Sequence, residues 1–69
     1  MKGLKDRDYV VFLEDIYFGF NLVFKKGSIG RITLYDYDTD FIIVDGKGIP
    51  LTKKQLRLAT IDEVRLWFL

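Results

Sequence analysis

The sequence predicts a small, mainly antiparallel β domain that ends in a short helix, and three observations lead to this class. Its 69 residues are enough for one domain and no more. Short runs of β-branched and aromatic residues alternate with turn-forming residues along the chain. Hydrophobic residues make up 49% and aromatic residues 16% of the sequence, well above the content of a disordered chain. We therefore expect residues 1–69 to fold as a single domain around an apolar core.

Two longer strands are expected in the first half of the chain, at 8–14 and 27–35. The first is an apolar run bounded by charged residues, and the second alternates with the period of two that a half-buried strand shows. Gly30 inside the second strand indicates a bulge or a close approach of two backbones. The segment 15–26 contains turn-forming residues such as Gly19 and is expected to be a long hairpin loop.

Shorter elements are expected in the second half of the chain. A polar turn at 36–40 precedes a fully apolar strand at 41–44. Asp45 followed by Gly46 is a strong hairpin-turn signal, because both residues tolerate the left-handed backbone conformation that such turns require. An extended segment restarts at 49–51.

The C-terminal part is expected to hold a single helical turn at 52–55, a short strand at 56–59 and a helix at about 61–68. Thr60 and Glu63 have the spacing of a capping box, in which each side chain accepts a hydrogen bond from the backbone amide of the other residue. Three apolar residues share one side of this helix and are expected to face the domain: Ile61, Val64 and Phe68.

The order of these elements resembles that of Src-homology-3-like small β-barrels. The basic Gly-x-x-Gly stretch at 24–32 is similar to the core of KOW-type bacterial barrels, and the residues from 44 to 57 are similar to their closing half. The resemblance covers about 8–59 and implies a five-stranded closed barrel, to which the helix at about 61–68 is an addition. It also implies a small accessory or inhibitor protein of the kind that phages and other mobile elements encode.

The expected core consists of apolar residues from every predicted strand: Val10, Phe12, Ile32, Leu34, Ile42, Val44, Leu56 and Leu58. The alternative is a two-layer α+β domain, in which an open sheet packs on the final helix. An open sheet leaves edge strands with unpaired backbone groups, whereas a closed barrel does not.

The side chains available for chemistry are few. The sequence has no Cys and no His, which excludes disulfides, the usual zinc sites and Ser–His or Cys–His catalysis. Acid–base catalysis would need paired carboxylates, such as Asp40 with Asp45 or Glu14 with Asp15, and the single serine, Ser28, has no neighbouring base. We therefore predict a protein that is not an enzyme and uses no cofactor.

A metal site is also not expected. Asp36, Asp38 and Asp40 have the spacing of the first three ligands of an EF-hand loop. However, Phe41 stands where the loop needs glycine, and Lys47 stands where it needs glutamate. The three aspartates are therefore interpreted as a solvated turn.

The sequence favours a cytoplasmic protein without a membrane partner. The longest uncharged run, 16–24, is shorter than the roughly 20 residues that a transmembrane helix needs. The first residues carry two acids and no apolar stretch of the length found in a signal peptide.

Exposed aromatic residues point to a protein partner. In the loop at 15–26 we expect Tyr17, Phe18 and Phe20 to lie at the surface, where aromatic side chains typically anchor protein interfaces. The barrel resemblance implies peptide binding against aromatics of this same loop. The alternative is that the loop folds back and caps the open end of the barrel. In the tail, the surplus apolar residues Leu66, Trp67 or Leu69 are expected either to wrap the base of the barrel or to meet another chain. We favour Trp67 at such a contact, which would allow a homodimer through the C-terminal helix.

Nucleic-acid binding is the alternative function. The net charge is only +1, but six basic residues form two groups that could merge into a patch for a phosphate backbone. These residues are Lys25, Lys26 and Arg31 in the first group and Lys53, Lys54 and Arg57 in the second.

Overall fold

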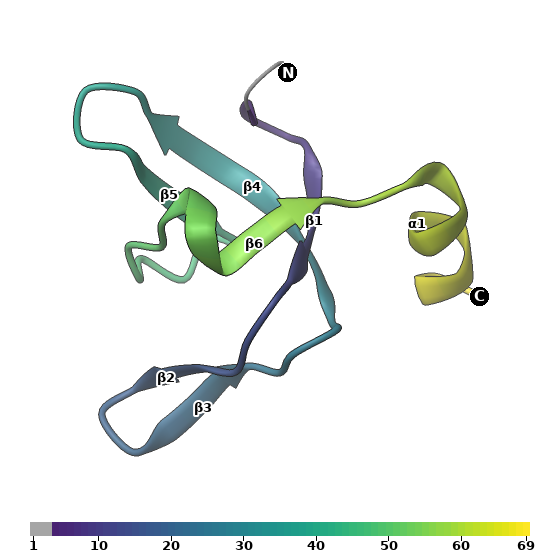
Figure 1. Cartoon of the computed structure of the whole chain (residues 1–69), viewed down its shortest axis with the longest axis horizontal. Coiled ribbons are helices and arrows are strands. Elements are labelled where there is room, and N and C mark those ends of the chain that lie inside the picture. The colour runs from purple at the N-terminus through teal and green to yellow at the C-terminus, as the bar shows by residue number, and fades with distance from the viewer. Residues whose placement is uncertain (1–3) are drawn as a thin grey trace.

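The computed structural model describes residues 4–69 and shows a mainly β domain with one short C-terminal α-helix (Figure 1). Four strands form an antiparallel sheet in the order β5-β4-β1-β6, and two strands form a separate hairpin, β2-β3. The predicted class is confirmed. The elements are β1 (Tyr9–Phe12), β2 (Ile16–Phe18), β3 (Asn21–Phe24), β4 (Ile29–Asp36), β5 (Phe41–Val44), the 3-10 helix η1 (Lys53–Gln55), β6 (Leu56–Leu58) and α1 (Ile61–Trp67).

Neither sheet closes into a barrel, so the expected five-stranded Src-homology-3-like barrel is wrong. In the part of the chain described, β5 and β6 are the two edges of the larger sheet, and an isolated bridge between Ile42 and Leu51 adds to the β5 edge. Closure requires strands long enough to tilt and stagger around an axis. Here β6 has only three residues, and β2 and β3 pair with each other instead of extending the larger sheet.

The segment expected as a long loop, 15–26, is a β-hairpin with its own ladder. Ile16 pairs with Phe24, and Phe18 pairs with Asn21. The open sheet of the alternative two-layer fold is present, but α1 does not cover it, because no residue of α1 is buried.

The core confirms six of the eight expected residues and excludes Leu34 and Leu58, which are 51% and 55% exposed. Leu34 is exposed because β4 contains a β-bulge. Ile32 lies opposite Val44, but Leu34 lies opposite the preceding residue of β5, so β4 holds one extra residue. Beyond a bulge the alternation of side chains reverses its phase, and Tyr35 is therefore buried in place of Leu34.

The structure buries six further residues. Three of them, Leu4, Ile16 and Phe24, lie outside the expected strands, whereas Val11, Tyr35 and Leu51 lie in segments that were expected to be extended. Two of them, Ile16 and Phe24, bring the base of the β2-β3 hairpin into the same core as the four-stranded sheet.

Two glycine positions were singled out from sequence, and the structure corrects the first and confirms the second. A Cβ atom on Gly30 would clash with a methyl group of Val44 and lie 3.2 Å from the Phe12 ring, so side chains and not a second backbone fill the space beside this glycine, and the bulge of β4 lies further on, between Ile32 and Leu34. Asp45 and Gly46 have φ values of 54° and 67°, as a turn of the predicted kind requires.

Candidate protein-binding surfaces

The β2-β3 hairpin is rooted in the core at its base. Ile16 and Phe24, which pair with each other across the hairpin, are both buried. The Phe24 ring stacks on the ring of Phe12 in β1, with 4.2 Å between ring centroids and 12° between ring planes. Because apolar burial on this scale contributes several kcal/mol, the base of the hairpin is held as part of the domain.

The outer part of the hairpin carries exposed apolar side chains. Its turn is formed around Gly19, and the neighbouring Phe20 is fully exposed, at 103% of its reference area. Tyr17 and Leu22 lie opposite each other across the two strands, and both are about half exposed. We call Tyr17, Phe18, Phe20 and Leu22 the hairpin surface; the sequence predicted the three aromatic members and missed Leu22.

The second candidate surface begins with the capping box of α1. The Thr60 hydroxyl accepts a hydrogen bond from the Glu63 backbone amide at 3.1 Å, and Glu63 Oε1 accepts one from the Thr60 amide at 2.9 Å. The predicted capping box is thus confirmed. It begins the helix directly after the extended residues 59 and 60, which lead the chain away from the sheet (Figure 1).

Glu63 also links α1 to the sheet. Both Arg57 guanidinium nitrogens Nη1 and Nη2 donate to the two carboxylate oxygens of Glu63, at 2.8 and 2.7 Å. The Arg57 guanidinium, together with the Thr60 amide, lowers the pKa of Glu63 from 4.5 to about 2. This forked ion pair joins β6 to the first turn of the helix.

The apolar side chains of α1 lie mainly in solvent, which corrects the expected inward face. Ile61 is 79% exposed and Phe68 is 64% exposed, although the Phe68 ring meets the edge of Tyr9 at 5.8 Å between centroids. Only Val64 of the three expected inward residues is partly buried. The helix is too short, and its connection too extended, to lay a full stripe on the sheet. We call Ile61, Leu66, Trp67, Phe68 and Leu69 the helix surface.

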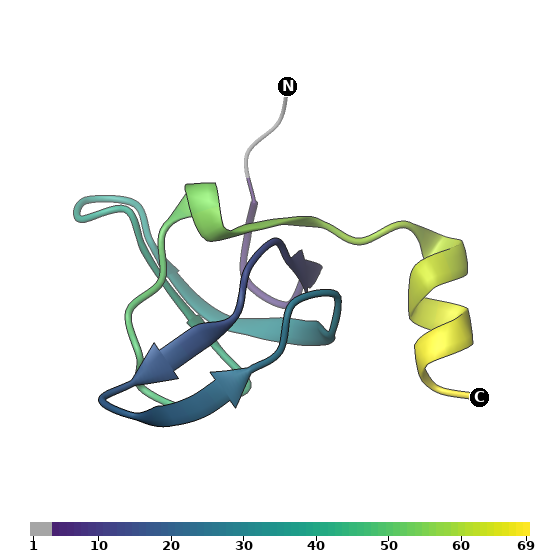
Figure 2. The same cartoon turned by 60° about the horizontal axis from the view of Figure 1, so that its bottom comes forward.

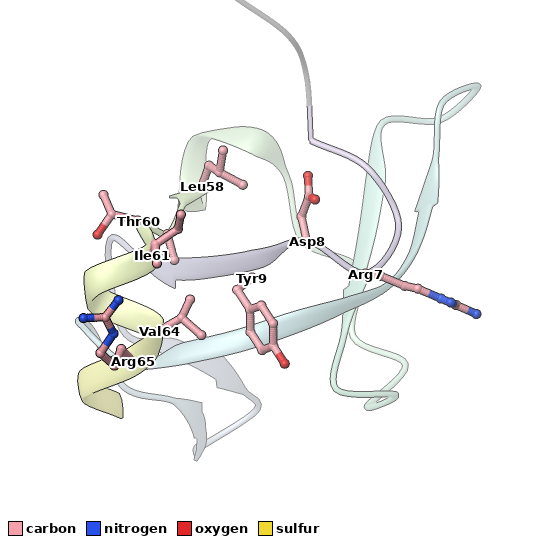
Figure 3. Close-up of a pocket in the computed structure, with 9 residues that line it drawn as sticks. Arg7, Asp8, Tyr9, Leu58, Thr60, Ile61, Val64 and Arg65 are labelled. Atoms are coloured by element: carbon pink, nitrogen blue, oxygen red, sulfur yellow. The ribbon is translucent and has the colours of Figure 1, made fainter. Parts of the chain in front are cut away.

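A shallow apolar cleft of about 420 Å³ separates α1 from the ends of β1 and β6 (Figure 3). Ile61 and Val64 line it from the helix side, and Tyr9 and Leu58 line it from the sheet side. The helix therefore meets the domain across an incompletely packed boundary, whose specific contacts are the Tyr9–Phe68 pair and the Arg57–Glu63 bridge.

The hairpin and the C-terminal end of α1 lie toward the same side of the molecule (Figure 2). Figure 2 shows the hairpin and the C-terminal end of α1 along its lower side, whereas η1 and the β4–β5 connection lie on the upper side. Figures 1 and 2 both place the hairpin and α1 at opposite ends of the molecule.

The six basic residues of the alternative function are dispersed over separate elements. Lys25 and Lys26 occupy the β3–β4 turn, whereas Lys53 and Lys54 belong to η1. The Lys53 ammonium lies 3.5 Å from the Asp40 carboxylate, and contacts with the Tyr35 hydroxyl and Asp40 raise its pKa.

The two arginines of this set also have protein partners. Arg57 binds Glu63, as described above, and Arg31 Nε donates to the Arg7 carbonyl at 3.0 Å while its guanidinium lies over the Tyr9 ring. Half of the six cations are therefore engaged by other groups of the domain.

The carboxylates that could serve chemistry have structural partners. Asp36 accepts hydrogen bonds from the Thr39 hydroxyl and from the Asp38 amide, which lower its pKa. Asp45 accepts a bond from the Arg31 amide at 3.0 Å, and Asp15 accepts one from the Lys26 amide at 2.8 Å. Among residues 4–69, no group of three or more possible ligands is arranged to hold a metal ion.

No protein-family profile, curated protein or solved structure matches this chain. Between residues 4 and 69, no helix has the length and apolar character needed to cross a membrane. A function must therefore be argued from the two surfaces of this chain itself.

Proposed function

We propose that the protein is a non-enzymatic binding module that acts through protein–protein contacts made by the hairpin surface and the helix surface. The observation that carries the proposal is that nine large apolar side chains on the β2-β3 hairpin and the segment 61–69 are about half to fully exposed. Exposed apolar patches of several hundred Å² are often functional, and aromatic residues such as these are enriched at the centres of interfaces.

Binding is favoured over catalysis by the chemistry of the side chains. The sequence contains no His or Cys, and three of the four carboxylates considered for catalytic pairs, Asp15, Asp40 and Asp45, accept hydrogen bonds within the domain. The expectation of a phage or mobile-element origin depended on the barrel resemblance and has no further support.

A protein partner is favoured over nucleic acid by the local charge. The hairpin residues 16–24 carry no charge. Two acids, Glu14 and Asp15, precede them and two lysines, Lys25 and Lys26, follow them, and the Asp15 carboxylate accepts a hydrogen bond from the Lys26 backbone amide. Binding to a phosphate backbone depends on a net excess of cations, which this side of the molecule lacks.

The test is capture of partners from the native host by the intact protein, with identification and quantification by mass spectrometry. Phe18→Ala and Phe20→Ala together should reduce capture of a specific protein partner by more than about tenfold, because truncated aromatic anchors typically have effects of this size. Leu34→Ala is the matched control, since Leu34 is a comparably exposed apolar residue outside both surfaces.

The dependence of binding on salt distinguishes a protein partner from nucleic acid. Capture through apolar contacts should persist at moderate salt, whereas nucleic-acid binding should lose about 0.7–0.9 units of log K per tenfold increase in salt for each phosphate contact. Equal capture by the double variant and by the wild type, or a steep salt dependence that follows Lys53→Glu and Lys54→Glu, would overturn the proposal.

A further inference from the structure

We infer that the partner is a second copy of this chain, in a two-fold dimer in which the hairpin surface of each copy packs on the helix surface of the other. The inference rests on the proposed function, since it names the partner of the same surfaces. It follows from three properties of these surfaces: their area, their charge and their relative position.

The area of the two surfaces together is sufficient for a stable interface. Each of the nine side chains is between about half and fully exposed. With roughly 150–250 Å² for a large side chain, the hairpin surface offers roughly 500 Å² and both surfaces more than roughly 1,000 Å². A specific interface takes about 800 Å² from each partner. An interface that covers the hairpin and the helix at once therefore buries enough area for a stable dimer.

The charge of the molecule permits self-association. The net charge is +1, so two copies experience almost no long-range repulsion. The hairpin is uncharged over residues 16–24, so in the dimer it places no charge against the helix surface of the other copy. Apolar contacts with few charges are typical of homodimer interfaces in particular.

The relative position of the hairpin and α1 allows a dimer with two-fold symmetry. The hairpin and the C-terminal end of α1 lie along one side of the molecule and at its opposite ends (Figure 2). When two such molecules meet face to face about a two-fold axis, the hairpin of each copy comes to lie against α1 of the other. The same contact is then made twice, and the assembly closes as a dimer without exposing an unfilled surface.

The first experiment is sedimentation of the intact protein from about 1 µM to about 1 mM, a range that covers weak and strong dimers. The wild type should form a dimer. Phe20→Lys and Trp67→Asp should each weaken it by more than about a hundredfold, because each substitution damages both symmetric contacts by about tenfold or more. A wild type that remains a monomer throughout this range overturns the dimer, while the protein-binding function is tested separately by host capture.

The second experiment mixes the two variants. In a heterodimer of Phe20→Lys with Trp67→Asp, one contact is wild-type and the other places a lysine and an aspartate in the same interface. The mixture should therefore dimerise more tightly than either variant alone. A helix-to-helix dimer would instead be insensitive to Phe20→Lys, and a hairpin-to-hairpin dimer would be insensitive to Trp67→Asp; either result overturns the inference.

Trp67 provides an independent readout, because it is the single Trp of the sequence. Its fluorescence should shift to shorter wavelength as the wild type dimerises. This shift should disappear in the Phe20→Lys variant, although Phe20 and Trp67 lie at opposite ends of the same molecule. Adding the Trp67→Asp variant to Phe20→Lys should restore the shift. Unchanged emission at all concentrations contradicts the inference.

Two further substitutions guard against misfolding of the first pair. Phe18→Lys and Leu69→Asp change well-exposed side chains in the same two surfaces. They should reproduce the loss and the rescue in variants whose far-ultraviolet circular dichroism matches the wild type. Folded variants that still form the wild-type dimer overturn the inference.

Discussion

The hairpin and α1 present similar exposed side chains but are attached to the domain in different ways. The hairpin is rooted by Ile16 and Phe24, which are part of the hydrophobic core. The helix contributes no buried residue and is held by the Arg57–Glu63 bridge and by one aromatic contact. The comparison shows two ways of holding exposed apolar side chains. The hairpin is held by packing in the core, whereas the helix is held by its cap and by an ion pair.

This difference predicts which perturbations spread through the molecule. Damage at the base of the hairpin should lower the stability of the whole domain, because the core is shared. Damage at the start of α1 should remain local, because a surface ion pair and a cap stabilise only the element that they join.

The largest effect is expected for Phe24→Ala. This substitution removes the stacking partner of Phe12 and leaves a cavity in the core, which should lower the free energy of unfolding by about 3–5 kcal/mol. Urea denaturation measures it. The same substitution at Phe20, in the same hairpin but fully exposed, should leave the stability of the monomer unchanged. A loss below about 1 kcal/mol for Phe24→Ala would show that the hairpin is not rooted in the core.

A smaller and local effect is expected for Thr60→Ala. Loss of the hydroxyl that accepts the Glu63 amide should destabilise α1 by about 1 kcal/mol. Amide hydrogen exchange should become faster at Val64, whose amide bonds to the Thr60 carbonyl, and should stay constant in β1 and β4. Thr60→Ser keeps the hydroxyl and is the control. Faster exchange throughout the sheet would contradict the local character of the helix.

Acid should loosen the same helix end. The folded-state pKa of Glu63 is about 2, below its ordinary value of 4.5, so its contribution is complete above about pH 4.5 and is lost as the pH falls toward 2. Helical circular dichroism should decrease over this interval. Glu63→Gln retains a capping amide without the charge, so its profile should lack this component. Identical acid profiles for the two proteins would exclude Glu63 as the titrating group.

The smallest effect on the sheet is expected when residues 61–69 are removed. Because α1 contributes no buried residue, the remaining chain should keep its four-stranded sheet, with a loss in unfolding free energy of less than about 1 kcal/mol. Urea denaturation and the exchange of sheet amides measure this outcome. An unfolded product would show that α1 supports the core as strongly as the hairpin does.

The features predicted correctly from sequence depend on neighbouring residues. The capping box uses Thr60 and Glu63, three positions apart, and the turn at Asp45 and Gly46 depends on backbone preferences of those two residues. Of the candidate site, the exposure of Tyr17, Phe18 and Phe20 agrees with the structure, because a turn in an apolar segment leaves its tip without a core to contact.

The features that were missed depend on contacts between distant segments. The bulge that buries Tyr35 and exposes Leu34 is a property of the β4–β5 register, and the Tyr35 amide donates to Asp6, which lies 29 residues away. Whether strands close into a barrel is equally a matter of which edges meet. Alternating apolar residues are compatible with either phase and with either topology.

The sequence by itself determined the mainly β class, the positions of the four strands of the larger sheet, the turn at Asp45 and Gly46 and the capped start of the C-terminal helix, because each of these results from conformational preferences and hydrogen bonds within a few residues. Only the tertiary structure decided that the sheet stays open, that the segment 15–26 pairs with itself, and that the hairpin is rooted in the core while α1 is not. These outcomes depend on how apolar area is divided among segments far apart in the chain, and that division is a property of the packed molecule as a whole.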